Sequence, residues 1–147
     1  RDRVKESFYH MITQGDYAAR ISGEDKEFLD RIIVVVEKNL EDEGFCIKKL
    51  SQEVGMSHST IYQRLKELSG LSVNGFVRWI RLKKAAELFI TTNLNVNEVA
   101  LQVGFGDGKY FREQFNKLYG VNPSEYIKKY RKMFSGKYHL DRDALKL

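Results

Sequence analysis

The chain contains an internal repeat, and this repeat limits the possible folds more than any other feature of the sequence. The segment LSQEVGMSHSTIYQRLKEL at residues 50–68 returns 49 residues later, where VGF at residues 103–105 replaces VGM at residues 54–56. One residue inserted in the second turn changes the offset to 50, so that Ser57 corresponds to Asp107. A repeat of this length predicts two copies of one supersecondary unit.

Each copy has the pattern of a short helix, a tight turn and a second helix. Gly55 suits the special backbone angle of the turn, and Ser57 suits an N-cap because its hydroxyl can accept a hydrogen bond from a first-turn amide. Two adjacent helices alone also fit an ordinary helical corner, but two copies favour a pair of helix-turn-helix units that place their second helices in DNA major grooves. In the first copy, apolar residues recur at helical spacing at Leu50, Val54, Met56, Ile61, Leu65 and Leu68.

A long helix is predicted between the two copies, over residues 72–90. It carries two apolar stripes, which indicates burial on two sides. About 19 residues at ~1.5 Å per residue span about 28 Å, which is comparable with the ~34 Å of one DNA turn. We therefore expect an all-α fold of about seven helices, with two helix-turn-helix subdomains joined by a long central helix that could place two recognition helices in successive major grooves. The stripes are Val73, Phe76 and Ile80, and Trp79, Leu82, Ala86 and Phe89.

The same patterns divide the chain into four segments. Residues 1–23 read as a linker or the tail of a preceding domain, because the chain starts with Arg and its first residues form a short apolar stripe. Residues 24–92 would hold the first subdomain with the linker helix, residues 93–133 the second subdomain, and residues 134–147 a C-terminal tail. Helix starts are predicted by SGED at residues 22–25, NVNE at 95–98 and NPSE at 122–125. The stripe consists of Val4, Phe8, Met11 and Ile12.

The distribution of charge favours a polyanionic partner. Residues 1–44 carry 7 Lys and Arg against 11 Asp and Glu, a net charge of −4, whereas residues 45–147 carry 18 against 9, a net charge of +9. The basic excess therefore coincides with the repeats, as in a protein that binds nucleic acid. A single Cys excludes an internal disulfide and favours a reducing cytoplasm, and no apolar run approaches the ~20 residues of a membrane helix.

Residues 24–132 resemble the DNA-binding domain of the AraC/XylS family of bacterial transcription regulators. The resemblance rests on residues 50–72, on RLKKAAELF at residues 81–89, and on VNEVALQVGFGDGKYFREQFNKLYGVNPSEY at residues 96–126. Lys109 stands where the family often has Ser. The resemblance implies sequence-specific binding of double-stranded DNA, possible membership of a hybrid two-component regulator as its C-terminal output domain, and RNA polymerase or a second copy of the regulator as protein partners.

Positions on the two recognition helices give the candidate contacts. Gln63 is suited to adenine, Arg112 or Lys109 to guanine, and Glu113 to a cytosine amine. For Arg81 a structural ion pair is the alternative to a phosphate contact. The candidate base-contacting residues are Ser59, Tyr62, Gln63, Lys109, Arg112 and Glu113. The candidate phosphate-contacting residues are His58, Lys66, Arg78, Arg81, Asn116 and Lys128.

The sequence offers no pattern for catalysis or for a metal. His10, His58 and His139 lie far apart and, with one Cys, give no metal-ligand spacing. The run GFGDG at residues 104–108 has neither a preceding strand nor a following Lys-Ser/Thr, so it is a poor phosphate-binding loop. We therefore expect no enzyme activity and no cofactor. The alternative to DNA binding is a helical protein-interaction module whose motif helices contact a partner protein.

Overall fold

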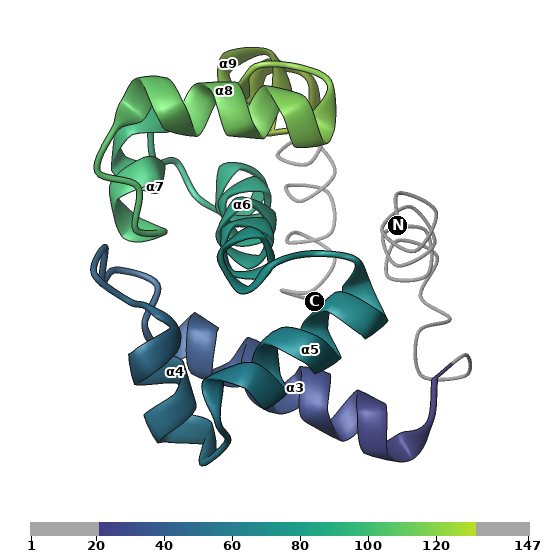
Figure 1. Ribbon diagram of the computed structural model, residues 1–147. Coiled ribbons are helices and arrows are strands. Elements are labelled where there is room, and N and C mark those ends of the chain that lie inside the picture. Colours follow the sequence, from purple (N-terminus) through teal and green to yellow (C-terminus); the bar gives the residue numbers. More distant parts are fainter. Residues whose placement is uncertain (1–20, 132–147) are drawn as a thin grey trace, which may run out of the picture. The chain divides into compact units, whose positions relative to one another are not determined.

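The computed structural model describes residues 21–131 and confirms the expected all-α class (Figure 1). Within this range the chain forms seven α-helices and a π-helical turn, and it has no strand. The apolar stripe predicted at residues 4–12 and the predicted tail at residues 134–147 lie outside the described residues. The elements are α3 (Gly23–Lys38), α4 (Ile47–Val54), α5 (His58–Ser69), α6 (Val73–Thr91), α7 (Val96–Gln102), α8 (Gly108–Tyr119), α9 (Pro123–Tyr126) and η1 (Ile127–Arg131).

The helices begin at the capping residues that the sequence predicts. The Ser57 hydroxyl accepts a hydrogen bond from the Thr60 amide at 3.2 Å, which fixes the first turn of α5. At α7 the capping box is complete, because Asn95 Oδ1 accepts from the Glu98 amide at 2.8 Å and Glu98 Oε1 accepts from the Asn95 amide at 3.0 Å. Asp107 caps α8 by accepting from the amides of its first turn. These caps satisfy amides that would otherwise lack partners within the helix.

Contacts divide the chain into two units, and the division falls inside α6, between Ile80 and Arg81. The boundary expected at residue 92 assigned all of α6 to the first subdomain. In the structure the residues of α6 up to Ile80 belong to the first unit and the residues from Arg81 onward to the second. The buried apolar residues of α6 lie on both sides of this division, with Val73, Phe76, Trp79 and Ile80 before it and Leu82, Ala86 and Phe89 after it.

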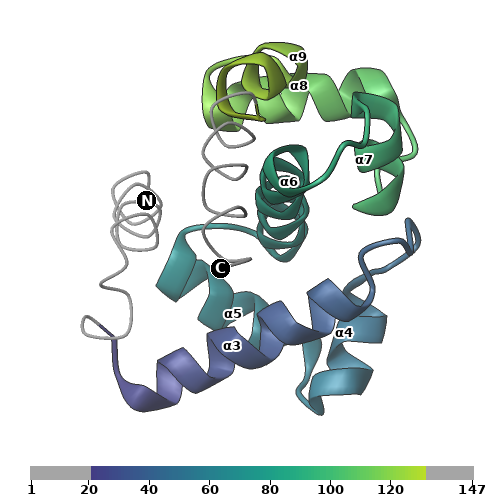
Figure 2. The same cartoon turned by 180° about the vertical axis from the view of Figure 1, so that it is seen from behind.

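In the first unit, α3 lies beside α4 and α5 (Figure 2). Arg64 of α5 forms an ion pair with Asp25 at 3.1 Å, and its guanidinium lies 4.1 Å from the ring centre of Phe28. The buried core is shared by all four helices of the unit and includes Phe28, Leu29, Ile32, Val36, Leu50, Val54, Ile61, Leu65, Phe76 and Trp79.

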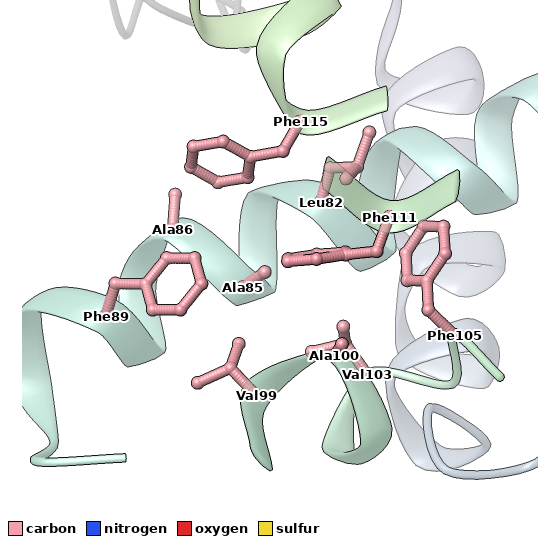
Figure 3. Packing of buried hydrophobic residues seen from close by; sticks show 10 residues of the cluster. All are labelled: Leu82, Ala85, Ala86, Phe89, Val99, Ala100, Val103, Phe105, Phe111 and Phe115. Atoms are coloured by element: carbon pink, nitrogen blue, oxygen red, sulfur yellow. The ribbon is translucent and has the colours of Figure 1, made fainter. Parts of the chain in front are cut away.

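In the second unit, four phenylalanine rings fill the space between α6, α7 and α8 (Figure 3). Phe111 lies 5.1 Å from Phe105, 6.2 Å from Phe89 and 5.9 Å from Phe115, measured between ring centres. Small residues of α6 and α7, among them Ala85 and Ala100, leave room for these rings. The core therefore fixes the rotation of α8 about its axis, and with it the direction of the outward side chains.

One arginine supports each helix-turn-helix turn. Arg31 of α3 donates to the carbonyl of Val54 at 2.5 Å, and Arg81 of α6 donates to the carbonyl of Val103 at 2.7 Å. Both carbonyls lie where the first helix of a motif ends. The two arginines are 50 residues apart and the two carbonyls 49 residues apart, so the repeat includes the helix that precedes each motif.

Candidate nucleic-acid interface

The outward face of α5 consists of the residues that the sequence assigned to base contacts. Ser59, Tyr62 and Gln63 are exposed, and 53% of Tyr62 is accessible. On the opposite face Ile61 and Leu65 are fully buried. The helix therefore presents a short polar face with one aromatic ring, which suits the hydrogen-bonding edges and thymine methyl groups of a major groove.

A surface hollow of about 700 Å³ brings these residues together with two other segments of the first unit. Its wall includes Ile47 at the start of α4 and the capping residue Ser72, followed by Asn74 in the first turn of α6. These three were not predicted as part of the site. The repeat gives no signal for them, because they come together only through the packing of α4 and α6 against α5. From α5 the hollow is lined by His58, Ser59, Tyr62 and Gln63.

Gln63 already makes one hydrogen bond on this surface. Its Nε2 donates to Glu67 Oε1, one turn further along α5, at 3.3 Å. The side-chain amide has two N–H donors and one carbonyl, so one N–H and the carbonyl remain. These are the two groups that a bidentate contact with adenine requires.

The outward face of α8 consists of Lys109, Arg112 and Glu113, which are all exposed, whereas Phe111 and Phe115 are fully buried. Arg112 Nη2 donates to Asn97 Oδ1, on the first turn of α7, at 3.1 Å. The structure thus brings the three predicted residues to one face and adds Asn97, for which the sequence pattern gave no signal.

Five of the six residues predicted to contact phosphates are exposed or half-buried, whereas Arg81 is buried. The prediction of a phosphate contact for Arg81 is therefore corrected. The fractional exposure of Arg81 is 6%, and its guanidinium donates to the carbonyl of Val103. A buried guanidinium that is bound to the backbone is not presented to a phosphate. The observed partner is a backbone carbonyl, whereas the alternative expected from the sequence was an ion pair. His58, Asn116 and Lys128 are exposed, and Lys66 and Arg78 are half-buried.

At the end of the second unit, Tyr126 of α9 packs against aromatic rings of α8, and one further arginine binds the end of α6. Tyr126 lies 5.2 Å from Phe115 and 5.5 Å from Tyr119, measured between ring centres. Burial raises the pKa of Tyr119, and the neighbouring Tyr126 adds to this shift. Arg131 donates to the carbonyls of Phe89 at 2.5 Å and Leu94 at 2.7 Å, which ties η1 to the C-terminal end of α6.

The other candidate chemistry is limited. Cys46 is exposed at the start of α4, where the nearby backbone amides of Lys49 and Lys48 lower the pKa of its thiol. Within residues 21–131, no three His, Cys, Asp or Glu side chains are grouped so that they could hold a metal ion. None of the helices in this range has the length and apolar character needed to cross a membrane.

Comparison with known proteins relates most of the chain to regulators. A family model described as a helix-turn-helix domain matches residues 50–129. Histidine kinase P4 of Formosa agariphila is 36% identical over 134 residues, which are 91% of this chain and 10% of that protein. The HTH-type transcriptional regulator MtrA of Neisseria gonorrhoeae is 39% identical over 105 residues, which are 71% of this chain and 34% of that protein. The chain therefore spans only about a tenth to a third of these two relatives.

Solved structures of isolated domains match over nearly their full length. The C-terminal domain of the two-component response regulator YesN from Fusobacterium nucleatum is 30% identical, with a TM-score of 0.59, and the match covers 69% of this chain and 98% of that domain. The DNA-binding domain of the global transcriptional factor AdpA, solved in complex with a target DNA, is 26% identical with a TM-score of 0.62. That match covers 71% of this chain and 94% of the AdpA domain.

Proposed function

Because the chain belongs to the AraC/XylS type of helix-turn-helix domains, we propose that it binds specific sequences of double-stranded DNA as the output domain of a bacterial transcription regulator. The observation that carries this proposal is the matched pair of faces on α5 and α8. Each helix is capped at its N-terminus, buries one apolar face, and presents three of the predicted polar side chains to solvent. The AdpA domain, which shares this fold, was solved with its target DNA.

Base readout on each face uses a different chemistry. On α5, Gln63 keeps the N–H and the carbonyl that adenine requires, and Tyr62 offers an apolar ring. On α8, Arg112 or Lys109 donates to guanine, and Glu113 accepts from a cytosine amine. Each well-formed bidentate contact contributes about 1–3 kcal/mol of discrimination between bases.

Phosphate contacts supply the part of the affinity that does not depend on sequence. The proposed contacts are His58, Lys66, Arg78, Asn116 and Lys128. Arg81 is excluded because it is buried. When lysine and arginine side chains bind phosphates, counterions are released from the DNA. The affinity for DNA therefore falls as the salt concentration rises.

We also propose that the two recognition helices occupy successive major grooves. The helix α6 has 19 residues, which at ~1.5 Å per residue extend over about 28 Å. Recognition helices that bind one face of DNA lie one helical turn apart, about 34 Å. The continuous helix between the two motifs supports this arrangement.

The relatives support a place in two-component signalling. The match to a histidine kinase covers 91% of this chain, and the YesN domain belongs to a response regulator. We therefore assign the chain to the output end of such a system in the cytoplasm, with RNA polymerase or a second copy of the regulator as its protein partner.

A binding experiment tests the DNA-binding proposal against the protein-interaction alternative. Duplex sites are selected from a random DNA pool, and the affinities for a selected site and a random duplex are measured over a series of salt concentrations. The proposal predicts that both affinities fall steeply with salt and that the selected site binds at least about 10³-fold more tightly. If no duplex binds better than random DNA, the protein-interaction module becomes the better explanation.

A further inference from the structure

Asn97 lies outside every predicted contact, yet it holds the main candidate for guanine recognition. Its Oδ1 accepts a hydrogen bond from Arg112 Nη2 at 3.1 Å. Asn97 is the second residue of α7, and the backbone on both sides of it is fixed by the reciprocal hydrogen bonds between Asn95 and Glu98. Arg112 is therefore bound to a rigid point on the neighbouring helix.

Gly108 provides the space in which this pair lies. It is the first residue of α8, one turn before Arg112. A Cβ atom at position 108 would lie 3.0 Å from Arg112 Nη1 and 3.7 Å from Asn97 Oδ1. The shorter distance is inside the roughly 3.5 Å at which non-bonded atoms make favourable contact, so a side chain at this position would require the Arg112 guanidinium to shift by a few tenths of an ångström.

The backbone gives no other reason for a glycine at position 108. The glycines with positive φ among the described residues are Gly55, Gly70, Gly104 and Gly120, and Gly108 is not one of them. In a helix, glycine is less favourable than alanine by about 1 kcal/mol in interior positions. The feature that a glycine contributes here is the open space occupied by the Arg112 guanidinium.

We propose that Asn97 and Gly108 are positioning residues that fix Arg112 for the recognition of guanine at one base pair of the DNA site. This inference rests on the proposed function. A guanidinium has five N–H donors, and Asn97 uses one of them, so a fork remains for O6 and N7 of guanine. An arginine that is already ordered loses less side-chain entropy on binding.

The charge around the pair suits an electronegative partner. Lys109 and Arg112 lie near the N-terminus of α8, where the helix dipole is positive, and the acidic residue there is the N-cap Asp107, whose carboxylate accepts from the amides of the first turn. Cations are unfavourable at this end of a helix. The guanine edge in the major groove offers two acceptors, and the adjacent phosphates add negative charge.

The test uses a duplex site that the unaltered chain selects from a random pool, together with the three single substitutions of every base pair in that site. Binding of this set is measured for the unaltered chain and for Arg112→Ala, Asn97→Ala and Gly108→Ala. Gln102→Ala, at the exposed end of α7, is the matched control. Melting temperatures are measured for all variants.

We expect Arg112→Ala to remove the preference for guanine at one base pair. Asn97→Ala and Gly108→Ala should each weaken the preference at that same base pair by about two- to tenfold, the range that one hydrogen bond provides. The melting temperature of Gly108→Ala should be unchanged or higher, because alanine favours a helix more than glycine. The double variant Asn97→Ala/Gly108→Ala should lose little more of the guanine preference than either single variant, since both substitutions act through Arg112.

Three results would overturn the inference, and they can be told apart from failure of the proposed function. If Arg112→Ala loses the preference while the other two variants keep it, the positioning role is wrong and DNA reading by Arg112 stands. If Asn97→Ala lowers affinity equally for all sequences, Asn97 contacts a phosphate instead. If the unaltered chain does not discriminate between duplexes, base reading at Arg112 is wrong and the inference fails with it. The same follows if the unaltered chain discriminates and Arg112→Ala discriminates equally well.

Discussion

Among single residues, Arg31 and Arg81 make the same kind of hydrogen bond in different surroundings. Each donates a hydrogen bond to the carbonyl at the end of a motif's first helix. Arg81 is buried, whereas Arg31 is exposed. The hydrogen bond of Arg81 is buried, whereas that of Arg31 is only partly buried. Water can replace a lost donor more easily at the partly buried bond, so the bond contributes more to stability in the second unit than in the first.

We expect Arg81→Met to lower the free energy of unfolding by about 1–3 kcal/mol, because methionine keeps the aliphatic volume but leaves the Val103 carbonyl without this donor. Arg31→Met is the matched variant and should have a smaller effect. Urea denaturation followed by far-ultraviolet circular dichroism measures both. Equal losses for the two variants would show that burial of the arginine is not the decisive difference.

Tyr119 gives a prediction for alkaline stability. Its pKa is raised in the folded protein, mainly by burial, so the folded state holds the phenolic proton more tightly than the unfolded state. This contribution to stability is fully present below the pKa of an unfolded tyrosine, about 10, and is lost as the pH rises above that value. Tyr119→Phe should therefore lose less stability than the unaltered chain between neutral pH and pH values above about 10.

Chemical denaturation at a series of pH values checks this expectation. Near neutral pH the comparison of the two chains sets the baseline, since Tyr119 is protonated in both the folded and the unfolded state there. If the free energy of unfolding falls equally with rising alkaline pH for the two chains, the loss of stability does not come from Tyr119.

Residue contacts were only partly predictable from the sequence. The exposure of Tyr62 and Arg112 follows from helical periodicity, because their burial depends only on the face of the helix that packs. The bond between Arg112 and Asn97 depends on the packing of α7 against α8 and on the choice of rotamer, which periodicity does not contain. Arg31 had an available signal, since it precedes Arg81 by the same 50 residues that relate the two motifs.

Among the helices, most starting points could be predicted from short sequence patterns. Capping by Ser57, Asn95 and Asp107 involves partners within three residues, so short sequence patterns identify it. The helix that begins at Pro123 continues beyond Tyr126 as the π-helical turn η1, a change of helix type for which the sequence contains no signal. Arg131 in this turn binds carbonyls 42 and 37 residues away in sequence, and such contacts are absent from local patterns.

The turn between α4 and α5 gives the prediction at this scale. Gly55 has φ +70°, and a Cβ atom there would meet nothing within 4 Å. The penalty for Gly55→Ala is therefore conformational, about 1–2 kcal/mol. Gly23→Ala is the control, because Gly23 also has open space but does not have a positive φ. Thermal unfolding should show a lower midpoint for the Gly55 variant only, and equal midpoints would contradict the strained turn.

At the scale of the whole molecule, the repeat predicted two similar units, and the structure contains them. The boundary between them was not predictable in detail, because both apolar stripes of α6 lie on one continuous helix and the sequence does not show where one core ends. The proposal at this scale is that both units read the same duplex at once. It requires the two half-sites to lie on one face of the DNA, about one turn apart.

The spacing of the half-sites shows whether both units bind one duplex at the same time. Footprinting on a selected site identifies the protected major-groove segments, and about five base pairs, half a turn, are then inserted between them. We expect two protected segments about one turn apart. After the insertion, one segment should be lost and the affinity should fall toward that of a single half-site. A single protected segment, or unchanged affinity after the insertion, would contradict it.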